Sequence, residues 1–188
     1  MSNTFEPPEL PDYMRVRPLG VALLGGLHLL GGLFMLVPLG MLVFNSAAAE
    51  HSLRQAGIPI SLLLAGMIIL GLLYFLSGLG MLAGKKWGWW LAVFYYVYSV
   101  ARHANALFLL EDMAEQLGAP EGGLVRFQIK YGVRIVFALL VLVYLFREPV
   151  RIYFRLEQTS KLRAIGTVMG VCLALWSAIS GALILMAD

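Results

Sequence analysis

The residues best suited to chemistry in this chain are polar side chains set inside otherwise apolar stretches. The strongest candidates share two neighbouring stretches, and they are Tyr95, Tyr98, Arg102, His103, Asn105 and Arg134. Polar groups are costly in apolar surroundings, so each marks a candidate site. Arginine suits the recognition of planar anions through paired hydrogen bonds. These residues predict a basic pocket for an anion, a lipid headgroup or the polar head of a quinone-like molecule.

A structural role for the two arginines is the alternative interpretation. Arg102 and Arg134 would then pair with Glu111, Asp112 or backbone carbonyl groups and clamp the fold. Helical spacing puts Arg102 ~22 Å beyond the tryptophans at 87–90. Arg134 is expected one turn inside the outer start of its own apolar stretch.

Other chemistry finds little support in the sequence. No HExxH, GxSxG or phosphate-binding glycine loop is present, and Cys172 is the single cysteine, which excludes an internal disulfide. A haem held by His28 and His103 is disfavoured because their expected depths, ~15 and ~24 Å, differ. The sequence predicts no catalytic residue, no metal ligand set and no bound cofactor.

The composition indicates that transmembrane helices position these side chains. Of 188 residues, 60% are hydrophobic and 13% are charged, whereas soluble domains average about 25% charged. Apolar stretches long enough to cross a bilayer cover residues 19–44, 60–83, 87–110, 131–146 (starting earlier, near Leu124) and 164–187. The predicted fold is an all-α integral membrane bundle with five transmembrane helices. The alternative is four spans plus an interfacial or re-entrant segment.

Basic residues predict the orientation of the bundle. With five spans, one side receives nine of them: Arg15, Arg17, Lys85, Lys86, Arg147, Arg151, Arg155, Lys161 and Arg163. The other side receives three: Arg54, Arg126 and Lys130. The positive-inside rule places the first set in the cytoplasm, so the N-terminus is expected inside and the C-terminus outside a plasma (inner) membrane. Residues 1–14 are predicted to be a disordered cytoplasmic tail, and residues 15–188 a single bundle domain.

Two segments are predicted to lie at the inner membrane surface. Trp87, Trp89 and Trp90 follow two lysines and are typical of an interfacial anchor. The segment 147–163 alternates basic and apolar residues and is expected either to lie as an amphipathic helix on an anionic leaflet or to serve as a basic linker.

Small residues predict where helices pack. A helix-packing stripe in the last apolar stretch consists of Gly166, Gly170, Ala174, Ser177 and Gly181. Such a stripe fits either packing within the bundle or an interface with a second copy or another membrane protein.

A weak internal repeat links the first two apolar stretches. Residues 25–36 align with 71–82 at seven of twelve positions, and Gly25-His28-Gly32 has the same spacing as Gly71-Tyr74-Gly78. Because these stretches run in opposite directions, a true repeat would be inverted, as in transporters. Chance similarity between helices rich in leucine and glycine is the alternative.

Three motifs carry a resemblance to a family. RVRPLGVALL (15–24), GLGMLAGKKWGWWLAV (78–93) and LVYLFREPVRIYF (142–154) together resemble a broad group of small, uncharacterised bacterial multi-span membrane proteins. The resemblance covers residues 15–155 and implies a prokaryotic plasma membrane and a helical bundle. It implies no activity and transfers no functional residue.

The sequence as a whole favours a non-enzymatic membrane component that binds a partner protein or lipid. The alternative is a small transporter or channel that uses an outward-facing basic pocket, and a haem- or quinone-binding membrane subunit comes third. The basic residues lie between apolar stretches, as topology signals do, so nucleic acid is not an expected partner.

Overall fold

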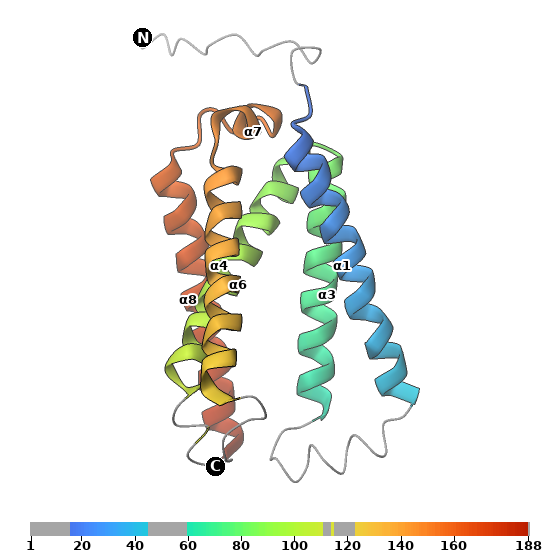
Figure 1. Cartoon of the computed structure of the whole chain (residues 1–188), viewed down its shortest axis with the longest axis vertical. Helices are drawn as coiled ribbons and strands as arrows, with labels where there is room; N and C mark the ends of the chain where they lie inside the picture. The colour runs from blue at the N-terminus through green and yellow to red at the C-terminus, as the bar shows by residue number, and fades with distance from the viewer. Residues whose placement is uncertain (1–15, 45–59, 111–113, 115–122, 188) are drawn as a thin grey trace.

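Every regular element of the described chain is helical. The computed structural model describes residues 16–44, 60–110, 114 and 123–187. The helices are α1 (Leu19–Phe44), α3 (Ile60–Leu82), α4 (Lys86–Phe108), α6 (Gly123–Leu145), α7 (Glu148–Tyr153) and α8 (Lys161–Ala187). Figure 1 shows the long helices side by side, with the short α7 lying across one end, here named the α7 end. The predicted tail, 1–14, lies outside the described residues.

Length and composition identify a helical membrane protein. Among the described residues, three helical segments are long and apolar enough to cross a bilayer: Leu19–Val37, Leu64–Leu82 and Gly123–Leu145. The all-α prediction is therefore confirmed. Membrane spans at α4 and α8 stay predictions.

Helices α1 and α3 form an antiparallel pair because small residues let their backbones touch. A β-carbon added at Gly78 would lie 2.7 Å from the Leu29 nitrogen and 2.8 Å from the Gly25 oxygen. One added at Gly32 would lie 2.7 Å from the Phe75 nitrogen. Such close approach is how membrane helices gain dispersion contacts. The two faces singled out by their shared spacing thus pack against each other.

A tight turn joins α3 to α4. Gly84 takes a positive φ of 63°, which glycine adopts at no steric cost. The Lys85 N–H donates to the Gly80 carbonyl at 2.9 Å and the Gly84 N–H to the Met81 carbonyl at 3.2 Å. This is a Schellman motif, and it satisfies carbonyls that the end of α3 leaves free.

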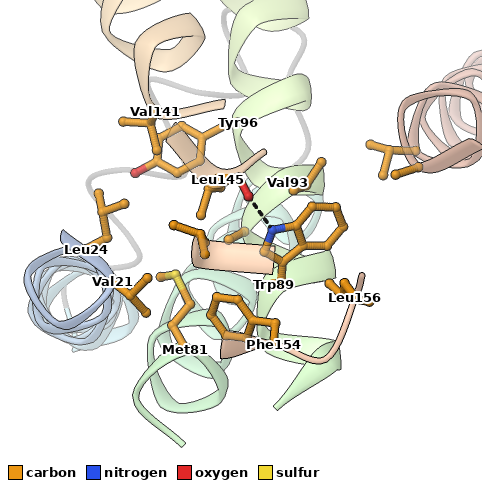
Figure 2. Packing of buried hydrophobic residues seen from close by; sticks show 14 of the residues in the cluster. Val21, Leu24, Met81, Trp89, Val93, Tyr96, Val141, Leu145, Phe154 and Leu156 are labelled. Atoms are coloured by element: carbon orange, nitrogen blue, oxygen red, sulfur yellow. Dashed lines mark hydrogen bonds between the residues drawn. The ribbon is translucent and has the colours of Figure 1, made fainter. Parts of the chain in front are cut away.

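The hydrophobic core lies at the α7 end (Figure 2). Its centre is Trp89, which is 1% exposed and whose Nε1–H donates to the Leu145 carbonyl at 2.9 Å. The predicted interfacial anchor is therefore wrong for Trp89, because the last turn of α6 covers this indole. Trp87 is 45% exposed and keeps the surface position expected of an anchor.

The segment 147–163 is built into the bundle. Val150, Phe154 and Leu156 are buried in the core. Arg151 donates hydrogen bonds to the carbonyls of Leu156 (3.0 Å), Glu157 (3.1 Å) and Thr159. Neither a helix resting on lipid nor a plain linker describes this segment, because its apolar side packs against protein.

Polar contacts tie the start of α1 to the same end. The Arg17 guanidinium donates to the Leu82 carbonyl at 2.7 Å and to the Tyr153 hydroxyl at 3.2 Å. The Tyr153 hydroxyl in turn donates to the Leu82 carbonyl at 3.3 Å. These bonds join α1, α3 and α7 at one point, so the α7 end is held by both apolar and polar contacts.

Helix α8 packs on the bundle through a face other than its glycine stripe. Ala164 and Val168 are buried, whereas Gly166 and Gly170 are exposed, with nothing near an added β-carbon. Ala174 is exposed too, and the burial of Ser177 and Gly181 lies outside the described part of the structure. Gly166 and Gly170 therefore do not pack against other helices of the bundle. The use of the stripe as an interface with a partner stays a prediction.

Candidate functional site

A pocket of about 420 Å³ opens between the α1–α3 pair and the α4–α6 pair. Its lining includes four predicted site residues, Tyr95, Arg102, His103 and Arg134. The structure therefore brings together side chains from α4 and α6 that the sequence only suggested as neighbours.

Two predicted residues lie apart from this pocket. Tyr98 does not line it and stacks on Phe94, with ring centroids 6.4 Å apart. Asn105 is exposed and is also absent from the lining. The lining residues 95, 96, 99, 102 and 103 share one face of α4, and at 3.6 residues per turn Tyr98 and Asn105 fall roughly 100–120° away from its centre.

Arg134 stands at the middle of a membrane helix. It lies 11 residues from each end of α6, or ~16 Å from either end. The prediction that it sits one turn inside the helix start is wrong, because α6 begins at Gly123 and continues through the polar residues before Tyr131. Its side chain is exposed at the pocket mouth.

His103 is the hydrogen-bonding neighbour of this arginine. It is 4% exposed, its Nδ1 lies 2.7 Å from the Ser99 carbonyl oxygen, and its Nε2 lies 3.4 Å from Nη1 of Arg134. A carbonyl only accepts, so Nδ1 carries the hydrogen. A guanidinium only donates, so Nε2 must accept. The contacts thus specify a neutral imidazole with its proton on Nδ1.

Within the part of the chain that the structure describes, no carboxylate neutralises the positive charge of Arg102 or Arg134. No ion pair to Arg102 or Arg134 occurs there, and Arg134 has His103 as its hydrogen-bond partner. Glu111 and Asp112, the partners expected for a structural clamp, lie outside the described residues. The part of the pocket that is described therefore presents positive charge.

The floor of the pocket is made of phenol rings. Tyr74 from α3 stacks on Tyr95 from α4, with centroids 4.4 Å apart. Tyr96 also lines the pocket, and its hydroxyl lies 2.8 Å from Nε2 of His28. Sequence reasoning did not include Tyr74 in the site, although its place in the repeated glycine spacing was a usable signal.

His28 lies fully buried beneath these tyrosines. Its Nδ1 is 3.1 Å from the Ser77 hydroxyl and its Nε2 contacts Tyr96, so three helices meet at one imidazole. Both ring nitrogens are thus engaged by protein groups, which leaves none directed at a haem iron in this arrangement. The histidine acts as a polar clamp between α1, α3 and α4.

Comparisons with known proteins do not add a family. Neither protein-family models, nor curated proteins, nor solved structures gave a match to this chain. The resemblance to small bacterial multi-span proteins stays a prediction, and the geometry of the pocket is the basis on which a function can be inferred.

Proposed function

We propose that the protein crosses a prokaryotic plasma membrane five times and binds an anionic phospholipid in the pocket between its helix pairs. It acts as a binding component without catalysing a reaction. The α7 end faces the cytoplasm, and the N-terminus is inside and the C-terminus outside.

The proposed topology is supported by helix length and charge. Helices α4 and α8 have 23 and 27 residues, enough for ~34 and ~40 Å at 1.5 Å per residue, and a bilayer core is ~30 Å thick. Most basic residues outside the helix interiors belong to segments at the α7 end, as the positive-inside rule requires of a cytoplasmic face.

The observation that carries the proposal is the position of Arg134. A guanidinium halfway along an apolar helix is costly in hydrocarbon, and such residues mark ligand or ion sites. Its neighbour His103 offers a neutral nitrogen, so the positive charge remains available to a ligand. An anion at the mouth would accept charge-assisted hydrogen bonds from Arg134 and from Arg102 on α4.

The apolar part of the lining favours an amphiphile over a free anion. Val133 and Phe137 are exposed beside Arg134, and Met35 of α1 completes the lining on the opposite side. An acyl chain would contact these side chains while its phosphate contacts the guanidinium groups. A volume of about 420 Å³ lies within the range of small-molecule sites and suits a headgroup with the first part of its chains.

Binding of short-chain lipids to the purified protein tests the proposal. Dihexanoyl phosphatidylglycerol should bind, and zwitterionic dihexanoyl phosphatidylcholine should bind far more weakly. Arg134→Gln should weaken phosphatidylglycerol binding at least ~10-fold, because it removes hydrogen bonds made by a charged group. Arg126→Gln is the matched control, since Arg126 is exposed on α6 outside the pocket. Equal affinity in the two variants would refute the site.

Transport of the same anion is the second candidate function. Arg134 lies ~16 Å from either end of α6, so a bound headgroup would sit between the two leaflets, as substrates do in many transporters. Reconstituted vesicles with a fluorescent phosphatidylglycerol separate the two functions. Accelerated exchange between leaflets that Arg134→Gln abolishes indicates transport, and binding without exchange indicates a binding component.

A further inference from the structure

We propose that the pocket takes up its anion together with one proton, and that His103 carries this proton. The inference rests on the proposed function, because it concerns the same anion site. It adds that occupancy of the site is coupled to the proton concentration.

The two nitrogens of the His103 ring have different hydrogen-bond partners. Nδ1 is fixed as a donor by the Ser99 carbonyl at 2.7 Å, and the Ser99 hydroxyl lies 3.2 Å from the same nitrogen. Nε2 faces Nη1 of Arg134 at 3.4 Å. A proton on Nε2 would put two cations in contact, so the neutral ring is the form that fits Arg134 as its neighbour.

A bound anion would change the charge that faces Nε2 of His103. A phosphate oxygen held by the Arg134 guanidinium at this place presents a negative charge to the Nε2 edge of the ring. Nε2 then gains by carrying a proton, because an imidazolium N–H donates a charge-assisted hydrogen bond to the phosphate. The imidazole keeps its Nδ1 bond to Ser99 throughout. Nε2 binds one proton from solvent and stops accepting from Nη1 of Arg134; its new N–H and the Arg134 guanidinium then both donate to the phosphate.

Of the titratable groups around the pocket, His103 is the one suited to bind the additional proton. Among the described residues, the charged and titratable side chains that line the pocket or contact the His103 ring are Arg102, Arg134, Tyr74, Tyr95, Tyr96 and Tyr131. Cys172 of α8 packs against the adjoining core. The arginines are already protonated and stay so. Tyrosine and cysteine are neutral near pH 7 and have no reason to bind a further proton. His28 has both ring nitrogens engaged by Tyr96 and Ser77, and it is buried beneath the floor.

Calorimetry in buffers of different ionisation enthalpy measures the coupled proton directly. The probe is dihexanoyl phosphatidylglycerol, whose phosphodiester keeps its single charge near neutral pH, so any proton taken up belongs to the protein. The wild-type enthalpy of binding should vary with buffer with a slope approaching one proton. Between the pH at which His103 loses its proton in the free protein and the higher pH at which it does so in the complex, the Kd should rise by up to tenfold per pH unit, and it should level off above that window.

His103→Gln is the decisive variant. A glutamine amide can donate to the Ser99 carbonyl and accept from Arg134, yet it does not titrate. The variant should bind the probe with no dependence on buffer and with a Kd independent of pH.

The outcomes separate the two proposals. Wild-type binding with no buffer dependence overturns proton uptake and leaves lipid binding in place. Uptake that persists in His103→Gln overturns the assignment to His103. Failure of the wild type to bind the probe removes the proposed function itself.

Discussion

Replacing Gly78 by alanine should destabilise the protein, and the same change at Gly66 should not. Both glycines lie within α3. The added methyl at Gly78 would be 2.7 and 2.8 Å from two backbone atoms of α1, whereas at Gly66 nothing lies within 4 Å. Backbone atoms cannot rotate away as a side chain does, so α1 and α3 must separate by several tenths of an ångström.

The expected magnitude comes from two opposing effects. Overpacking by one methyl costs about 1–3 kcal/mol, and replacing glycine by alanine in a helix returns about 1 kcal/mol. Gly78→Ala should therefore lose up to about 2 kcal/mol, and Gly66→Ala should gain up to about 1 kcal/mol. For a chain of this size each kcal/mol moves the Tm by about 2–4 °C.

Thermal unfolding in a single mild detergent, followed by circular dichroism, measures the difference. The two variants have the same composition, so detergent effects on α3 hydrophobicity cancel in the comparison. We expect Gly66→Ala to melt above the wild type and Gly78→Ala below it. A Gly78→Ala protein that melts at or above Gly66→Ala would refute the close approach of the two backbones.

Two further predictions concern buried hydrogen bonds. Trp89→Phe should lower the free energy of unfolding by about 1–3 kcal/mol, because it leaves a terminal backbone carbonyl of α6 without its donor. Trp87→Phe, at an exposed position, should change it by less than about 0.5 kcal/mol, and equal losses in a denaturant titration would argue against the buried indole. Tyr96→Phe should cost about 1–3 kcal/mol by depriving His28 of its partner. Tyr98→Phe serves as its control in the same titration, since Tyr98 lies outside this hydrogen-bonded cluster, and a neutral Tyr96→Phe would contradict the clamp.

The helices were predictable because apolar length is a local property of the sequence. The start of α6 was expected near Leu124, one residue from the observed Gly123, but the position of Arg134 was judged from the apolar stretch that begins at Tyr131. Arg126, Gln128 and Lys130 interrupt its hydropathy, although the helix continues through them. This is why Arg134 was expected near an end and lies at the middle. Helix boundaries depend on backbone hydrogen bonds, which polar side chains do not break.

The site was predicted on its α4 side and missed on its α3 side. Arg102 and His103 share one stretch, so helical spacing alone relates them. Tyr74 enters the pocket only because α1 and α3 pack at a particular register, which depends on contacts between distant glycines. In the same way, three neighbouring tryptophans look alike in sequence, and only the position of the last turn of α6 decides that Trp89 is covered.

The pairing of α1 with α3 also bears on the order in which the protein is made. Both helices and their close contacts belong to residues 19–82, and neither helix contains Asp, Glu, Lys or Arg. Because chains fold from the N-terminus during synthesis, this hairpin can assemble in the bilayer before the charged side chains of the later helices are made. With α4 crossing the bilayer as proposed above, Arg102 and then Arg134 would enter afterwards, beside a hairpin that already presents Tyr74. The two arginines would thus enter the membrane only after α1 and α3 have formed one side of the pocket.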